Sequence, residues 1–135
     1  RRVLFRSASA TTTPQVTTAF AGLVVTSPNP DFRWRVNGQA VERTSDGGRA
    51  WRVQSVELPG PMTAGSAPSA AVCWLVGKRG TVLVGVGGRW QTLSLADAAD
   101  LVAVRATDAM TASVTAADGR RFNTIDAGAS WSQIN

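Results

Sequence analysis

Histidine and tyrosine are both absent from the 135-residue chain. Histidine is the most frequent general base and a common metal ligand, and tyrosine is the nucleophile of some glycosidases. The single cysteine, Cys73, excludes an internal disulfide, and because it lies in the apolar segment 70–76 we expect it to be buried as a small hydrophobic residue. No apolar run approaches the ~20 residues that span a bilayer. We therefore expect no catalytic site, no bound metal, no cofactor and no membrane insertion in this segment.

Charged residues are also few: they make up 17% of the chain against 44% hydrophobic residues, which is typical of a folded domain. The formal net charge of +5 depends on residues 1–7, whose sequence RRVLFRS resembles the translated end of a sequencing adapter joined to a truncated reading frame. Without the three arginines of that segment, 14 basic residues become 11 against 9 acidic ones, a net charge of +2. So small an excess does not favour nucleic acid as a partner. The same interpretation predicts that the natural protein extends further toward its N-terminus.

The remaining chain divides into a linker and one domain. Residues 8–18 consist mainly of Ser, Thr and Ala, which is typical of a flexible tether. Residues 19–135 contain short apolar segments separated by turn residues, as expected of a domain built from strands.

Self-similarity at a period near 40 residues is the strongest signal in this domain. Segment 61–80 aligns with 100–119 without a gap, and Trp34-Arg35-Val36 aligns with Trp74-Leu75-Val76 at an offset of 40. The repeats cover about 23–57, 61–95 and 100–135. Several short strands in a unit of this length are typical of β-propeller blades and not of helical repeats. We predict an all-β fold of three tandem four-stranded propeller-type blades, a partial or open β-propeller with almost no helix.

The expected strands follow from apolar runs and from alternation. In the first repeat they cover 23–25, 32–36, 40–44 and 51–56, with Trp34 and Val36 on one face of the second strand and Arg33 and Arg35 on the other. In the second repeat, segment 71–76 is apolar throughout, as expected of an inner strand buried on both faces, and further strands cover 81–86 and 90–95. In the third repeat the strands cover 101–104, 110–114 and 121–124.

A turn motif with the pattern Ser/Thr-x-Asp-x-Gly-x-x-Trp recurs in the repeats. It comprises two complete copies at Thr44, Asp46, Gly48 and Trp51 and at Thr124, Asp126, Gly128 and Trp131, and a shortened copy without the Asp at Gly88 and Trp90. The glycine permits a positive φ, the Asp accepts hydrogen bonds from backbone amides, and the Trp begins the next strand and covers the sheet. The pattern resembles the Asp-box, or bacterial neuraminidase repeat, turn of propeller blades. We assign these residues a structural role and not a catalytic or metal-binding one, and we expect the turn at 86–90 to be the least well fixed.

Three blades leave the two terminal sheets without neighbours. Closed propellers have about 4 to 8 blades, because closure protects the strand edges. Either upstream blades are missing, or the chain pairs with a second copy, or the three sheets pack as an open wedge. Because a linker precedes the first repeat, we favour the wedge or self-association.

A longer blade pattern, W-x-V-G-x-x-G-x-h-h-x-T-x-D-G-G-x-x-W with h apolar, is matched in parts by Trp34-Arg35-Val36, by Val76 to Leu83 and by Thr44 to Trp51. In this pattern the chain from 23 to 135 resembles the photosystem II assembly/stability factor family. It resembles more closely a C-terminal domain of bacterial membrane proteins similar to zinc-finger anti-sigma factors, where the domain follows a transmembrane helix and a Ser/Thr/Pro linker. The photosynthetic members bind a membrane-protein assembly intermediate outside the cytoplasmic face. The resemblance thus implies a β-propeller repeat protein that binds a protein partner and lies on the extracytoplasmic side, tethered through an N-terminal part.

We therefore predict a non-catalytic protein-interaction or scaffold module, with a protein partner and no nucleic acid. Arg33, Arg35 and Arg43 lie on adjacent expected strands and predict a cationic patch that docks an acidic protein surface, with a solvated sheet face as the alternative. A glycan-binding or glycosidase-type relative of the Asp-box enzymes is the alternative function, which the missing tyrosine and histidine disfavour. A purely structural stalk domain is a third possibility.

Overall fold

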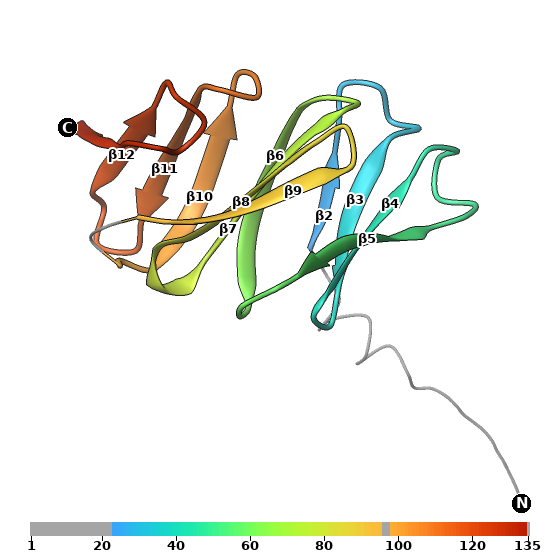
Figure 1. The fold of residues 1–135 in the computed structure, drawn as a ribbon, viewed down its shortest axis with the longest axis horizontal. Coiled ribbons are helices and arrows are strands. Elements are labelled where there is room, and N and C mark those ends of the chain that lie inside the picture. Colours follow the sequence, from blue (N-terminus) through green and yellow to red (C-terminus); the bar gives the residue numbers. More distant parts are fainter. Residues whose placement is uncertain (1–22, 96–97, 135) are drawn as a thin grey trace, which may run out of the picture.

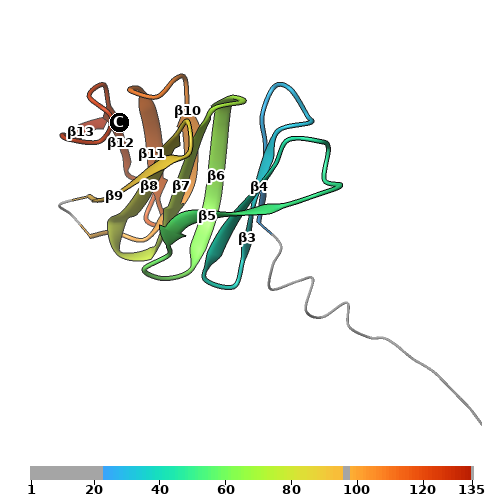
Figure 2. The same ribbon diagram turned by 45° about the vertical axis from the view of Figure 1, so that its right-hand side comes forward.

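The computed structural model describes residues 23–95 and 98–134, so the predicted adapter segment 1–7 and linker 8–18 lie outside the described residues. The described chain forms three four-stranded antiparallel sheets, and in each sheet strands that are consecutive in sequence are neighbours. Figure 1 shows the three sheets side by side, with the second between the first and the third. This confirms the predicted all-β fold of three propeller-type blades, and the stack is open because blades 1 and 3 lie at opposite ends (Figures 1 and 2).

Each blade is a meander of four strands. Blade 1 consists of β2 (Val24–Thr26), β3 (Arg33–Asn37), β4 (Ala40–Thr44) and β5 (Arg52–Glu57). Blade 2 consists of β6 (Met62–Ser69), β7 (Val72–Gly77), β8 (Thr81–Val86) and β9 (Arg89–Ser94). Blade 3 consists of β10 (Leu101–Ala106), β11 (Ala112–Ala116), β12 (Arg121–Thr124) and β13 (Ser132–Ile134). The 3-10 turn η1 (Lys78–Gly80) is the one helical segment among the described residues.

Several strands begin one or two residues away from the predicted position. The second strand of blade 3 begins at Ala112 and not at Met110, because the Asp108 carboxylate accepts hydrogen bonds from the backbone N–H groups of Met110 and Thr111, both at 2.8 Å, and holds them in a turn. The fourth strands of blades 1 and 3 begin one residue after Trp51 and Trp131.

The sheets pack face to face, so each blade has a forward face toward the next blade and a backward face toward the one before. The pairing register places these residues on the forward faces of blades 1 and 2: Trp34, Val36, Val41 and Arg43, and Trp74, Val76, Val82 and Val84. It places these on the backward faces of blades 2 and 3: Cys73, Leu75, Leu83 and Gly85, and Ala112, Val114, Phe122 and Thr124. Two apolar clusters fill the interfaces, one between blades 1 and 2 and one between blades 2 and 3.

Strand β7 is buried along its whole length because both of its faces belong to these clusters. The prediction of an inner strand buried on both faces is thereby confirmed. Polar bonds also join neighbouring blades: Trp74 Nε1 donates to Asp108 O at 3.0 Å, and the N–H of Ala106 donates to Ser66 Oγ at 3.0 Å. The middle blade therefore holds both terminal blades.

Candidate functional site

The 44–51 turn is held by the side chains of Thr44 and Asp46. Thr44 Oγ1 donates to Asp46 Oδ1 at 2.8 Å and accepts a hydrogen bond from the N–H of Gly48 at 3.0 Å. Asp46 Oδ1 also accepts hydrogen bonds from the backbone N–H groups of Arg49 and Ala50, both at 3.0 Å. These bonds lie within the turn itself, so its conformation follows from local sequence.

The 124–131 turn repeats this network and adds a serine. Thr124 Oγ1 donates to Asp126 Oδ1 at 2.7 Å and accepts from the N–H of Gly128 at 2.9 Å. The N–H of Ser130 donates to Asp126 Oδ1 at 2.9 Å, and its hydroxyl donates to Asp126 Oδ2. At the position of Gly47, which has φ +77°, this turn has Ala127 with φ +63°.

The hydrogen bonds keep both carboxylates ionised. The Ser130 hydroxyl, followed by the Thr124 hydroxyl, lowers the pKa of Asp126 from 3.8 to about 2. The N–H of Ala50, followed by the Thr44 hydroxyl, lowers the pKa of Asp46. A carboxylate with a lowered pKa is a poor proton acceptor near neutral pH. The structural role of both residues stays a prediction.

The third turn is a two-residue hairpin between Val86 and Arg89. Gly87 and Gly88 have φ values of +59° and +86°, which is the type I′ geometry that suits the twist of a hairpin. The N–H of Gly87 also donates to Ala71 O at 2.9 Å. The shortened motif thus forms a different, smaller turn. That this turn is the least well fixed of the three stays a prediction.

The tryptophans after the three turns have different surroundings. Trp131 packs edge to face on Trp74 of blade 2, with ring centroids 6.5 Å apart. Trp90 lies on Gly85, where a Cβ would overlap its ring, and packs against the cluster between blades 1 and 2. Trp51 lies under the guanidinium of Arg35, which is 4.1 Å from the ring centroid.

The structure separates the three arginines that the sequence placed in one cationic patch. Arg33 and Arg35 lie on the backward face of blade 1, where Arg35 Nε pairs with Glu42 Oε1 at 2.6 Å. Arg43 is the partner of Trp34 in the register and lies on the forward face. The prediction of one patch is therefore wrong for Arg43, which lies on the opposite face from Arg33 and Arg35. The reason is parity: β3 and β4 are joined by the two-residue loop Gly38-Gln39, so odd-numbered residues of β3 share a face with even-numbered residues of β4.

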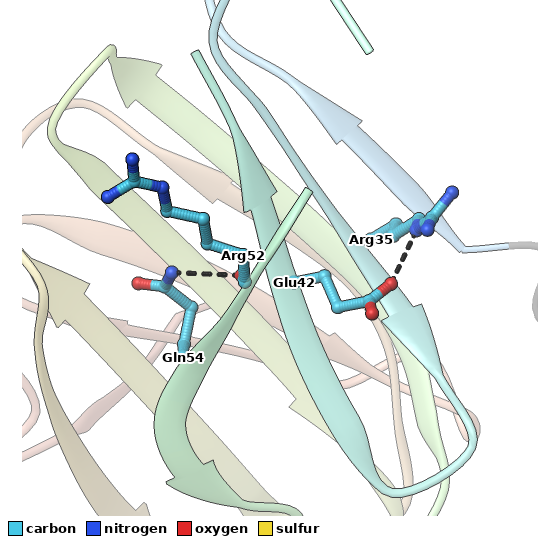
Figure 3. A network of polar contacts seen from close by, with 4 residues as sticks. All are labelled: Arg35, Glu42, Arg52 and Gln54. Atoms are coloured by element: carbon cyan, nitrogen blue, oxygen red, sulfur yellow. Dashed lines mark hydrogen bonds and ion pairs between the residues drawn. The ribbon is translucent and has the colours of Figure 1, made fainter. Parts of the chain in front are cut away.

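A different pair of arginines shares the forward face. Arg52 of β5 is the register partner of Arg43, and Gln54 lies two residues further along the strand. Figure 3 shows Arg52 and Gln54 on one side of blade 1, with the Arg35–Glu42 pair on the other. The sequence interpretation missed this pair, although counting residues through the hairpin loop places Arg43 away from Arg33.

Arg43, Gln54 and Arg52 border two adjoining hollows. The first, about 270 Å³, is lined by Trp34, Arg43, Gln54, Ala71, Gly85, Gly87, Gly88 and Trp90. The second, about 240 Å³, is lined by Arg43, Ser45, Asp46, Ala50, Arg52 and Gln54. We call these residues together the interblade groove. A hollow between blades 2 and 3 has no charged residue in its lining, which consists of Ser94, Leu95, Phe122, Gly128, Ala129, Ser130, Trp131 and Gln133.

The guanidinium of Arg43 is held in place by the protein and still has N–H groups without a hydrogen-bond partner among the described residues. Arg43 Nη2 donates to Ala70 O at 2.7 Å, and its guanidinium lies 5.0 Å from the ring centroid of Phe32 and 5.3 Å from that of Trp34. A guanidinium carries five N–H donors, so this one bond leaves capacity for a ligand carboxylate. The aromatic ring of Trp90, whose Nε1 donates to Gln54 Oε1 at 3.4 Å, provides an apolar wall. The groove therefore combines positive charge with aromatic surface.

The described residues also bear on metal binding, thiol reactivity and membrane insertion. Among 23–95 and 98–134 no group of three or more Cys, Asp or Glu side chains is placed to hold a metal ion. Burial raises the pKa of the Cys73 thiol, and the side chain is fully buried in the cluster between blades 1 and 2. In the same part of the chain no helix has the length and apolar character of a membrane span.

No protein-family model and no curated protein matches the chain. Solved structures do. The structure titled YCF48 bound to D1 peptide superimposes with a TM-score of 0.67 at 20% identity over 84% of this chain and 41% of that one. YCF48 from Cyanidioschyzon merolae superimposes with a TM-score of 0.67 at 22% identity over 82% of this chain and 38% of that one.

These likenesses establish the fold. The chain has a YCF48-like propeller fold, which agrees with the resemblance to the photosystem II assembly factors seen in the sequence. The chain spans about two-fifths of the length of the YCF48 structures that it matches. It thus corresponds to a partial propeller in comparison with them.

Proposed function

We propose that this chain is a non-catalytic interaction module that binds an extended, carboxylate-bearing segment of a protein partner in the interblade groove. The observation that carries the proposal is the pairing of Arg43 and Arg52 on the forward face of blade 1, beside the rings of Trp34 and Trp90. Arginines match carboxylates in geometry and charge, and aromatic rings bind the apolar parts of a peptide. Asp46, the one acidic residue lining the groove, has its Oδ1 atom occupied by backbone amides.

Two further facts support a peptide as the ligand. One of the solved structures that share this fold is of YCF48 bound to a D1 peptide, so a propeller of this type accommodates a peptide. The groove also lies between two sheets joined by apolar packing, which provides a rigid scaffold for surface loops. The glycan-binding alternative has no comparable support.

The wider setting is part of the same proposal. By its sequence resemblance, the module is the outer, extracytoplasmic part of a larger bacterial protein that is anchored in the membrane and similar to an anti-sigma factor. Fusing alkaline phosphatase, which is active only after export, to the C-terminus of the complete natural gene product tests the location. An inactive fusion would place the module in the cytoplasm and overturn this part.

Peptide binding is measured by calorimetry with three probes: an acidic peptide, its Asn/Gln counterpart, and the D1 peptide. We expect the acidic peptide to bind more tightly than the neutral one, and added salt to weaken it because ions screen exposed charges. Arg43→Gln and Arg52→Gln should each weaken binding about tenfold or more, as charge-assisted hydrogen bonds contribute about 1.5–3 kcal/mol.

Arg33→Gln is the matched control, since it removes the same charge from the opposite face of the blade. It should leave binding unchanged. Equal affinity for the acidic and neutral peptides, or an equal loss in Arg33→Gln and Arg43→Gln, would contradict a specific site in the groove.

A further inference from the structure

The three blades differ in the chemistry of equivalent positions on their forward faces. Blade 2 presents to blade 3 four apolar side chains, Trp74, Val76, Val82 and Val84, all of which are buried. Blade 1 presents to blade 2 the equivalent set Trp34, Val36, Val41 and Arg43, of which the first three are buried. These faces form the two apolar clusters that hold the stack together.

Blade 3 has no such forward face. The repeat offset of 39 and the strand register place Ser113 and Thr115 where blade 2 has Trp74 and Val76. On the next strand, Arg121 and Asn123 replace Val82 and Val84. Arg105 of β10 lies on the same face, opposite Ser113. A sheet that packed on this face would bury two arginines without a carboxylate at these register positions, which is unfavourable.

The backward face of blade 1 shows the same replacement. Where blade 2 has Cys73, Leu75 and Leu83, blade 1 has Arg33, Arg35 and Glu42. Arg35 and Glu42 form an ion pair, and the Arg35 guanidinium covers the ring of Trp51. In blades 2 and 3 the turn tryptophan packs instead against the blade before it, as Trp131 does on Trp74. On blade 1, Arg35 thus covers the turn tryptophan, whereas in blades 2 and 3 the preceding blade covers it.

We propose that blades 1 and 3 are capping blades whose outer sheet faces stay in water, so that neither a further blade nor a second copy of this chain packs on them. Terminal repeats with polar outer faces keep stacked repeat proteins soluble. The two faces carry an excess of arginine, with Arg33 and Arg35 on one and Arg105 and Arg121 on the other. Their apolar side chains Val24, Val53 and Ile134 are exposed and scattered between these charges. Head-to-tail association of copies would bring like charges together. On this proposal the outer faces of blades 1 and 3 are the two solvated ends of the stack.

The test measures the molar mass of the full 135-residue chain by light scattering after size exclusion over a wide concentration range. The expected mass is that of the monomer, 14.1 kDa, at every concentration. Two variants add or reverse charge on the outer faces, Thr115→Arg on blade 3 and Arg33→Glu on blade 1. On capping faces neither variant should change the mass.

The opposite variant restores the blade 2 pattern on blade 3: Ser113→Trp, Thr115→Val, Arg121→Val and Asn123→Val. It should bind a hydrophobic dye and self-associate with rising concentration, because an apolar sheet face is then exposed. An oligomer of the parent chain that Thr115→Arg or Arg33→Glu converts to monomer would overturn the proposal. An oligomer that neither variant changes would use another surface and would support it.

Discussion

The 44–51 and 124–131 turns have nearly the same internal hydrogen bonds and very different surroundings. In both, a buried threonine hydroxyl bonds the Asp and the Gly N–H, with distances that agree within 0.1 Å. Trp131 packs on Trp74 and belongs to the cluster between blades 2 and 3, whereas Trp51 is covered by the charged side chain of Arg35. The motif determines the turn, and the neighbouring blade determines what its tryptophan contributes.

This comparison separates local from tertiary stabilisation within one molecule. The hydrogen bonds of each turn join residues at most four positions apart. The contact between Trp74 and Trp131 joins residues from adjacent blades. Changes in the turn should therefore have similar effects in both copies, and changes in the tryptophan should not.

The largest expected difference is between the two tryptophan truncations. Trp131→Ala should lower the free energy of unfolding by about 3–5 kcal/mol, because it leaves a cavity against the core. Trp51→Ala should lower it by about 1 kcal/mol, since the ring loses mainly its contact with the partly buried guanidinium of Arg35. Urea denaturation followed by circular dichroism measures both.

Trp131→Phe is the control, because it keeps an aromatic ring and removes an N–H that is buried without a partner among the described residues. It should be milder than Trp131→Ala. Equal losses for the alanine variants of Trp51 and Trp131 would show that the neighbouring blade does not decide their contribution.

The second prediction exchanges residues at a position of positive φ in the two turns. Gly47→Ala should destabilise the protein by about 1 kcal/mol, because a Cβ is unfavourable in the left-handed region. Ala127→Gly relieves the same strain and should stabilise it by up to about 1 kcal/mol, less the entropy that a glycine gains in the unfolded chain. Thermal melts of both variants test this. Changes of the same sign in both would contradict equivalence of the two turns.

The third prediction concerns the cover over Trp51. A double-mutant cycle with Arg35→Ala and Trp51→Ala should give a coupling free energy of about 0.5–1 kcal/mol, the range for a cation–π contact that is not fully desolvated. Each corner of the cycle is measured by urea denaturation. The same cycle with Arg33 in place of Arg35 should give no coupling, and a coupling as large as that of Arg35 would mean that charge in general and not this contact stabilises Trp51.

The smallest effect concerns the pKa values of the turn carboxylates. Ser130→Ala should raise the pKa of Asp126 from about 2, and Ala50→Ser should lower that of Asp46 further by adding the same hydroxyl donor. Carboxyl-carbon NMR titration measures both. Because the folded pKa of Asp126 lies below the unfolded value, its contribution to stability is present above pH ~4 and is lost as the pH falls toward about 2. An unchanged titration in Ser130→Ala would contradict the role of that hydroxyl.

The sequence predicted the strands and turns well, because their signals are local. The apolar run 71–76 identified the doubly buried strand β7, and the two complete turn motifs are hydrogen-bonded within their own copies. It misplaced the start of β11, since the turn that Asp108 makes has no apolar signal. It also grouped Arg43 with Arg33 and Arg35, because proximity in sequence does not show which face a side chain takes.

An all-β chain of three similar blades could be predicted from the sequence, because the repeat period, the glycine turns and the alternation of apolar residues are visible in it. How the three copies differ depends on the stacking of the sheets. It placed Arg43 with Arg52 in a groove against blade 2, put Trp131 on Trp74, and left Trp51 under Arg35. Burial of these side chains depends on residues of other strands and other blades, which come together only when the sheets stack.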